Sequence, residues 1–398
     1  MNQAELEFVD EDDAVLDKKD AERFHQAVLY ATDWTVETIL SQMSRGNIDM
    51  NPRFQRRDAW NFKGKSRFVE SIVLGLPIPQ IVLAEKHQHR GQFIVLDGKQ
   101  RLLSLLQYAG KAEGDNNGFA LTGLEARPDL NRVRYEKLRA DPGRIDDFNA
   151  FNNHTIRTVV IRSWPNREFL HLVFLRLNTG SLKLSPQELR QAMVPGPFVD
   201  FADDHARSSK GLHDLLSIDN PDPRMRDVEL LVRYFGFRRF LEQYGGRMKQ
   251  HLDDTCEKLN KIWASGEDGI RVDADEFEAG ASTLIDVFGA SGVARKLDSP
   301  AFNRAIFDSL IYYASMPALT EAIRGGKVEM KQAYSRVVSD DAFREAVESD
   351  TAGIPNTHAR LRIWGEVLRD TLGVDVPIPV LSKDPGTGAS RIRLQSIG

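Results

Sequence analysis

One short segment combines an acid, a glycine and two cations at the junction of a strand and a helix. The apolar run 93–96 predicts a buried strand, which is followed directly by Asp97, Gly98 and a helical pattern that starts at Lys99. A helix start carries unpaired N–H groups and a partial positive charge, which together suit a phosphate. Gly98 lets the backbone approach such a ligand, Arg101 offers a planar fork for two phosphate oxygens, and Lys99 adds a point charge. The spacing therefore predicts a bend that binds the phosphate of a nucleotide.

The same bend supplies candidates for phosphate chemistry. Asp97 is expected to hold a divalent metal such as Mg²⁺, or a ribose hydroxyl, while Gln100 would orient water or a base edge. With Arg101 they make up the candidate catalytic residues, and Ser104, one turn further along the helix, is a further candidate for nucleotide binding. The alternative is a plain strand-to-helix turn in which Asp97 caps the helix and Arg101 is solvated, because short motifs match by chance.

Basic and aromatic side chains alternate just upstream of this bend. The cluster contains Arg53, Gln55, Arg56, Arg57, Lys63, Lys65 and Arg67, with Phe54, Trp60 and Phe62 between them. Aromatic rings among cations suit phosphate contact and base stacking, so DNA is an expected partner, bound by Arg57, Lys63, Lys65 and Arg67. The alternative is a solvated charged face whose aromatic rings belong to the core.

A second polar segment is a candidate third wall of the ligand site. Asn178 and Thr179 precede Gly180, which ends a helix, and the next helix begins with Ser185, Pro186 and Glu188, a full capping box. If the two helices form a tight hairpin, Asn178 and Thr179 lie near Glu188 and join the nucleotide-binding residues.

The order of the expected elements divides the chain of 398 residues into two domains. Residues 1–24 form an acidic leader that is expected to be mobile, since its like charges cannot offset their ordering entropy by burial. Residues 25–195 mix strands and helices, 196–375 carry only helical patterns, and 376–398 are rich in Pro and Gly and are expected to form a tail. The fold class is therefore α+β, with a sheet domain followed by an all-helical domain.

Apolar periodicity predicts the individual elements. Strands are expected over 81–84, 93–96, 119–121 and 155–161. Helices are expected over 24–43, 65–76, 99–108, 166–177, 186–193, 228–244, 248–263, 276–288, 300–315, 330–337 and 357–372.

Composition excludes several classes of protein. Apolar residues make up 41% and charged residues 28%, which is ordinary for a globular protein. No apolar run approaches the roughly 20 residues of a membrane span, and the acidic start lacks a signal core, so the protein is expected to be cytoplasmic, without a membrane partner. The single Cys256 and nine scattered histidines show no spacing typical of a metal-dependent nuclease.

Residues from about 35 to 195 resemble the N-terminal domain of GmrSD-type modification-dependent restriction enzymes. The likeness rests on motifs in the expected order: Pro52–Arg56, Glu70–Pro79, Leu96–Arg101, Leu177–Gly180 and Leu184–Arg190, with Arg224–Leu230 and Phe235 extending it. The resemblance implies a ParB/sulfiredoxin-like fold with a small mixed sheet. It also implies a nucleotide site at Asp97, Gly98, Gln100 and Arg101, aided by Arg53 and Arg56. Gln55, between these two arginines, is a further candidate for nucleotide binding. The chain departs from the family at Lys99, where Gln is usual, and in showing no HNH-type nuclease domain.

These observations lead to one main hypothesis and two alternatives. The main one is a sensor or regulator of a restriction or antiphage system that binds a nucleoside triphosphate with Mg²⁺ and hydrolyses it. DNA cleavage would then fall to a partner, a nuclease or another defence protein. The first alternative is a DNA-binding or scaffold protein with a vestigial nucleotide pocket, and the second is a cryptic nuclease. The nucleotide preferred and the oligomeric state do not follow from the sequence.

Overall fold

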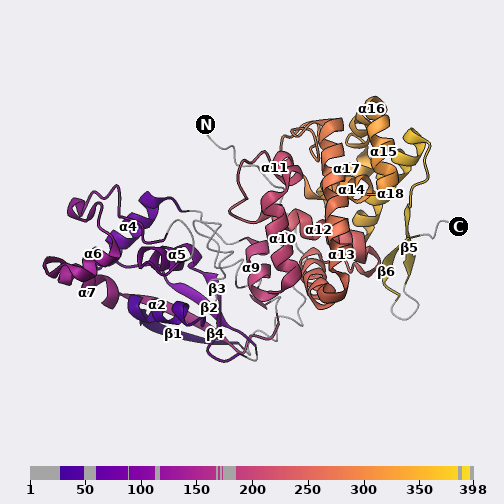
Figure 1. Ribbon diagram of the computed structural model, residues 1–398. Helices are drawn as coiled ribbons and strands as arrows, with labels where there is room; N and C mark the ends of the chain where they lie inside the picture. The colour runs from indigo at the N-terminus through magenta and orange to yellow at the C-terminus, as the bar shows by residue number, and fades with distance from the viewer. Residues whose placement is uncertain are drawn as a thin grey trace. The chain divides into compact units, whose positions relative to one another are not determined.

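The computed structural model describes residues 27–48, 60–87, 89–112, 117–166, 169–170, 173, 185–383 and 388–394. Contacts within the chain divide these residues into two compact units, one within Leu16–Met193 and one within Val194–Gly398 (Figure 1). The leader predicted over 1–24 lies outside the described residues.

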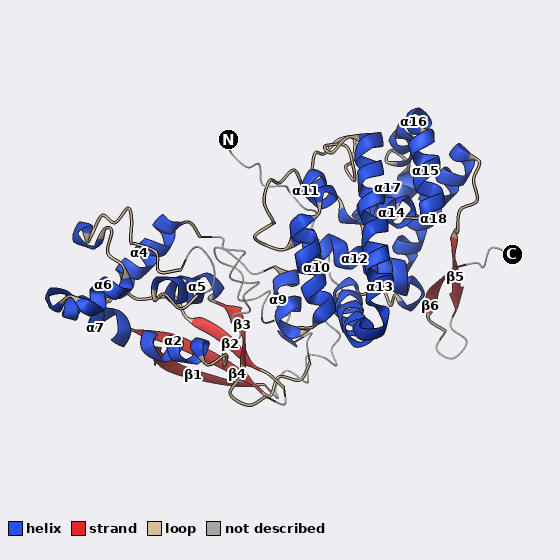
Figure 2. Cartoon of the chain, in the orientation of Figure 1, coloured by secondary structure: helices blue, strands red, loops and turns tan. Residues whose placement is uncertain are grey.

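The first unit is built on a small mixed sheet (Figure 2). Its strands are β1 (Val28–Thr35), β2 (Ile81–Glu85), β3 (Phe93–Asp97) and β4 (Thr155–Arg162), in the order β1-β4-β2-β3. β1 and β4 are antiparallel, β4 and β2 parallel, and β2 and β3 antiparallel. This arrangement confirms the α+β class and the three strands predicted at 81–84, 93–96 and 155–161.

β1 replaces the first half of the helix predicted over 24–43. The helical spacing holds only from Val36, where α2 (Val36–Ser44) begins with the Thr35 hydroxyl accepting a hydrogen bond from the Thr38 amide at 3.1 Å. Val28, Leu29 and Tyr30 are all exposed, because β1 is an edge strand. No alternation of apolar and polar residues therefore distinguished this strand from a helix.

Two hydrophobic clusters cover the two faces of the sheet. Along β2, Ile81 and Leu83 pack into one cluster while Val82 and Ala84 pack into the other, as expected for alternating side chains. The larger cluster includes residues of α2, α4 (Phe62–Val73), α5 (Lys99–Tyr108), α6 (Tyr135–Ala140) and α7 (Ile145–Asn153). The smaller one includes Leu189 of α9 (Pro186–Met193). The bend after β3 therefore lies between α5 on one face and α9 on the other.

The region 111–150 has more helix than its polar composition predicted. α6 and α7 lie there, with the short 3-10 helices η2 (Pro128–Leu130) and η3 (Pro142–Arg144), and the weak strand expected over 119–121 is not formed. Leu138 and Phe151 are buried and anchor α6 and α7 to the larger cluster. Each of these helices is therefore anchored by a single buried apolar residue. The sequence could not predict them, because one apolar residue does not make a helical pattern.

The second unit is helical apart from one hairpin. Its helices are α10 (Pro197–Ser208), α11 (Lys210–Leu216), α12 (Arg226–Phe240), η4 (Leu241–Gln243), α13 (Met248–Phe288), α14 (Arg304–Ala314), α15 (Pro317–Gly325), α16 (Lys327–Val337), α17 (Asp341–Glu348) and α18 (Ile354–Leu372). The hairpin consists of β5 (Pro379–Lys383) and β6 (Ser390–Leu394), which pair antiparallel. This hairpin occupies part of the predicted tail, and it is anchored by the fully buried Ile392 and by contacts to α18 and η4.

α13 is the axis of this unit, since α10, α11, α12, α14, α15 and α16 all contact it. Its 41 residues correspond to about 60 Å at 1.5 Å per residue. The sequence predicted two helices here, over 248–263 and 276–288, because Gly266, Gly269 and several charges interrupt the apolar pattern between them. Burial of Ile270 and Ala274 carries the helix through that interruption.

Replacing Gly280 by alanine is expected to lower the free energy of unfolding by about 1–3 kcal/mol, because the methyl group would overpack the α13–α14 contact. A Cβ at Gly280 would lie 2.8 Å from the backbone N of Ser315, whereas a Cβ at Gly266 of the same helix would meet only the Ile262 side chain at 3.6 Å. Gly266→Ala is the matched control and should be neutral or stabilising. Urea unfolding of both variants measures the difference, and equal stabilities would contradict the close approach of α13 to α14.

Candidate functional site

The bend after β3 strongly favours glycine. β3 ends at Asp97, Gly98 has φ 97° and ψ 11°, and α5 begins at Lys99. A Cβ at Gly98 would lie 3.0 Å from Ile81 Cγ1 and 3.3 Å from Arg101 Nη2. The left-handed backbone and the close neighbours both disfavour a side chain here, and the guanidinium of Arg101 lies against the glycine.

An ion pair holds the guanidinium over the bend. Arg101 Nη2 donates to Asp97 Oδ2 at 2.8 Å and to the carbonyl oxygen of Gln80 at 3.0 Å. The Asp97 side chain is 34% exposed and that of Arg101 is 15% exposed, so both remain accessible to a ligand. The Nε–H of Arg101 is itself buried and has no hydrogen-bond partner in the described structure. The arginine is thus fixed in place with a donor unused.

The start of α5 also has unused donors. Its first position is preceded by Gly98, which has no side chain to cap the helix, and no other described side chain does so. Asp97 Oδ1 accepts a hydrogen bond at 2.7 Å from the Gly98 amide instead. The alternative in which Asp97 caps the helix and Arg101 is solvated is therefore not what the structure shows. Amide groups, a partial positive charge and a fixed guanidinium meet at one point, an arrangement suited to an oxyanion.

Lys99 points away from this point. Its Nζ donates to Glu188 Oε1, and both side chains are buried, at 5% and 4% exposed. Glu188 belongs to the capping box predicted for α9: its Oε2 accepts from the Ser185 amide at 2.7 Å, and its own amide donates to Ser185 Oγ at 3.0 Å. The predicted phosphate contact of Lys99 is therefore replaced by a buried ion pair that joins the start of α5 to α9.

Gln100 and Ser104 also differ in what they offer a ligand. Ser104 is fully buried, and its hydroxyl donates to the Gln100 carbonyl oxygen at 2.7 Å, the usual bond of a serine inside a helix. Contrary to the prediction, Ser104 therefore does not face a ligand. Gln100 Oε1 is buried and has no hydrogen-bond partner. An acceptor beside the bend is therefore enclosed without a partner, which calls for a bound water, a ligand or another explanation.

Residues 36–195 match the model of the family described as GmrSD restriction endonuclease, N-terminal domain. Residues 36–195 are therefore similar to a GmrSD N-terminal domain, and they are called the GmrSD domain here. The match confirms the resemblance seen in the sequence, and it spans the bend, α5 and α9. The family is one of restriction endonucleases, so the GmrSD domain associates the chain with DNA restriction and defence. No curated protein matches the chain.

Sequence reasoning missed two glutamines of the GmrSD domain. Gln187 and Gln191 lie four residues apart on α9, flanking Glu188, and Gln191 is 1% exposed. Both amide atoms of Gln191 and the Nε2 of Gln187 have no hydrogen-bond partner. A buried polar group without a partner costs about 1–3 kcal/mol, so such groups call for a ligand or another explanation. Two glutamines four apart on the capping-box helix were the only signal, and that spacing alone does not distinguish them from a solvated face.

The basic cluster of the GmrSD domain is only partly described. Lys65 is buried, with its Nζ 5.2 Å from the centre of the Phe62 ring, and so has no surface to offer DNA. Arg67 donates to Glu125 at 2.8 Å, and Lys63 lies 4.0 Å from the same carboxylate. Two of the predicted DNA contacts, Lys63 and Arg67, thus lie beside the same carboxylate. A third, Lys65, is buried because it lies on the face of α4 that packs against the core.

Six predicted site residues lie outside the described residues: Arg53, Gln55, Arg56, Arg57, Asn178 and Thr179. Within the described part of the chain, no three His, Cys, Asp or Glu side chains group together as ligands of a metal ion would. No helix among the described residues has the length and apolar character that crossing a membrane requires.

Proposed function

We propose that the GmrSD domain binds a nucleoside triphosphate at the bend from Asp97 to Arg101 and hydrolyses it. The observation that carries the proposal is the position of the Arg101 guanidinium, which rests on Gly98 beside the uncapped start of α5. Amide groups and a guanidinium that converge before the ligand arrives need no rearrangement to bind phosphate oxygens.

Asp97 fits the role of a metal ligand. An ionised carboxylate has about four acceptor positions, and the described bonds to Gly98 and Arg101 use two of them. Mg²⁺ is usually bound by one or two protein carboxylates together with the phosphates of the substrate, so a single acid suffices here. When bound, Mg²⁺ would neutralise charge on the phosphates.

Hydrolysis in this proposal is electrostatic. A water oxygen forms a bond to the terminal phosphorus, the bond from that phosphorus to the bridging oxygen breaks, and a diphosphate nucleotide and phosphate leave, with one proton released to solvent. Negative charge on the transferred group is stabilised by Arg101 and by the amides at the start of α5. Gln100, whose Oε1 has no protein partner, orients the attacking water.

The chain as a whole would act as a nucleotide-dependent sensor or regulator in DNA restriction, with cleavage carried out by a partner nuclease. This role is supported by the family of the domain. It is also supported by the position of the bend between two helices on opposite faces of one sheet. The Lys99–Glu188 pair links those helices, so a shift of α5 on ligand binding at the bend would also move α9.

Phosphate release from ATP, GTP, CTP and UTP, each with and without Mg²⁺, tests this function. The full chain is expected to hydrolyse at least one nucleotide in the presence of Mg²⁺, and Asp97→Asn to lower the rate about 100-fold. Asp146→Asn, an exposed acid of α7 in the same unit, is the matched control and should leave the rate unchanged. A chain that neither binds nor hydrolyses any of the four nucleotides, or an Asp97→Asn variant as active as the original, would refute the proposal.

A further inference from the structure

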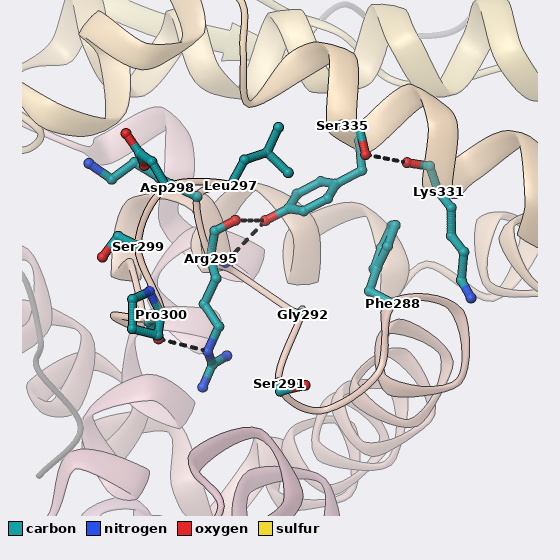
Figure 3. Close-up of a pocket in the computed structure, with 12 residues that line it drawn as sticks. Phe288, Ser291, Gly292, Arg295, Leu297, Asp298, Ser299, Pro300, Lys331 and Ser335 are labelled. Atoms are coloured by element: carbon teal, nitrogen blue, oxygen red, sulfur yellow. Dashed lines mark hydrogen bonds between the residues drawn. The ribbon is translucent and has the colours of Figure 1, made fainter. Parts of the chain in front are cut away.

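The helical unit contains a cavity that the nucleotide proposal does not use. It has a volume of about 640 Å³ and lies between the loop that joins α13 to α14 and the helix α16 (Figure 3). Cavities that bind small molecules are typically about 300–1,000 Å³, so this one has the size of a ligand site. All its lining residues belong to the unit within Val194–Gly398, so it is independent of the bend at Gly98.

A buried cation without a carboxylate partner lines the cavity. Arg295 is 7% exposed, and no described Asp or Glu forms an ion pair with it. Its guanidinium donates instead to the carbonyl oxygens of Pro300 at 3.2 Å, Val293 at 2.5 Å and Leu215 at 3.3 Å, and it lies 5.2 Å from the centre of the Phe302 ring. Three of its five N–H groups are thus used. Within the described structure, its positive charge is stabilised by carbonyl dipoles and not by a carboxylate. Burial lowers the pKa of the Arg295 guanidinium, as expected for an uncompensated charge.

The backbone around this arginine is held rigidly. The Tyr334 hydroxyl accepts from the Arg295 amide at 3.1 Å and donates to the Arg295 carbonyl oxygen at 2.7 Å. Ala294 has φ 55°, a strained value for a residue with a side chain, and its carbonyl oxygen accepts from the Asn303 amide at 2.8 Å. Strain that the surrounding structure maintains is often found at ligand sites. The guanidinium is therefore fixed before any ligand binds.

The remaining walls combine apolar surface with positive charge. Arg295 and Phe288 lie on opposite sides of the cavity, with Gly292 between them (Figure 3). Leu297, at the edge, is 66% exposed, an unusual position for a large apolar side chain. The charged residues that line the cavity are Arg295, Lys296, Asp298 and Lys331, and the ammonium of Lys296 is paired with Glu348 at 2.9 Å. One wall thus suits an oxyanion and the other a flat apolar group.

We propose that this cavity binds a small organic oxyanion, a phosphate or carboxylate attached to a flat apolar body. The oxyanion accepts from the two N–H groups of Arg295 that no carbonyl takes, and the body lies against Phe288 and Leu297. A guanidinium presents paired donors that match two oxygens of either anion, so the shared chemistry is a bidentate oxyanion contact. The buried positive charge then has the counter-ion that the described protein does not supply.

Calorimetric titration of the full chain with phenyl phosphate, benzoate and phenol tests this site. Whichever of phenyl phosphate and benzoate binds with the higher affinity shows whether the site prefers a phosphate or a carboxylate. Phenol, which lacks the anion, should bind at least tenfold more weakly than the anionic probe with the higher affinity. Arg295→Gln should lower the affinity for that anionic probe about 10–100-fold, because a charge-assisted hydrogen bond is lost. Arg101→Met should leave this binding unchanged, which separates the cavity from the bend. Binding of phenol as tight as that of both anions, or loss of binding in Arg101→Met, would overturn the assignment.

A pair of variants at Leu297 covers the case in which Arg295→Gln fails to fold. Leu297 is exposed, so neither Leu297→Glu nor Leu297→Gln removes buried packing, and the two differ in charge but not in shape. An acid at the edge of the cavity should repel the anionic probe and weaken its binding at least tenfold, whereas the neutral glutamine should change it about threefold or less. Equal binding by the two variants would show that no anion enters the cavity.

Discussion

Replacing Arg101 by methionine is expected to weaken nucleotide binding at least about 100-fold, because two charge-assisted hydrogen bonds to phosphate oxygens would be lost, each contributing about 1.5–3 kcal/mol. Methionine keeps most of the apolar length of the side chain and removes the donors. Equilibrium binding of the nucleotide preferred by the full chain, measured by calorimetry or by a fluorescent analogue, gives the change directly. Unaltered affinity would show that Arg101 only holds Asp97 in place.

Arg101→Lys is the matched control, since it keeps the charge and loses the planar fork. It should bind more weakly than the original chain and more tightly than Arg101→Met. Neither variant should unfold the domain, because the Asp97–Arg101 pair is partly exposed and such pairs contribute at most about 1 kcal/mol. A large drop in melting temperature would instead assign Arg101 a structural role.

The central elements of the sheet domain were predictable because their signals are local. β2, β3 and β4 are continuous apolar or branched runs, α5 begins directly after a glycine, and α9 has a complete capping box. The edge strand β1 and the continuous α13 were not predictable in the same way. β1 buries little of its surface, and α13 is held across its glycines by neighbours that are distant in sequence.

The bend itself was also predictable, except for the direction of Lys99. Asp97 and Arg101 are four residues apart and share one side of the start of α5, as their ion pair confirms. Lys99 is two residues from Arg101, and side chains two apart on a helix do not face each other. The sequence therefore contained the evidence that both cations cannot reach one phosphate. The partner of Lys99 was beyond local reasoning, since Glu188 lies 89 residues away.

The glutamines of α9 illustrate a different limit. Gln187 and Gln191 are polar residues on a helix whose sequence gives no reason to bury them. Only the packed structure shows that they are enclosed and have amide atoms without partners. Buried amide atoms without partners call for a bound molecule or another explanation, and no local pattern in the sequence signals them.

Breaking the Lys99–Glu188 pair is expected to destabilise the domain more than any other change at the site. Lys99→Met leaves the Glu188 carboxylate buried without the ammonium, and Glu188→Gln leaves the ammonium buried without its counter-charge. Each single variant should lose about 3–5 kcal/mol of unfolding free energy, the usual result of removing one member of a buried ion pair.

The double variant Lys99→Met with Glu188→Gln distinguishes charge from packing. Removing both charges leaves no uncompensated ion, so the double variant should recover most of the stability lost by either single one. Urea unfolding of the original chain, the two single variants and the double variant gives the coupling energy between the two residues. A coupling energy near zero would mean that the two charges are not paired in solution. If the double variant is stable and still binds nucleotide at its original affinity, Lys99 positions α5 against α9 and takes no part in binding phosphate. If it is stable and binds more weakly, the ammonium acts on the ligand through the field at the bend.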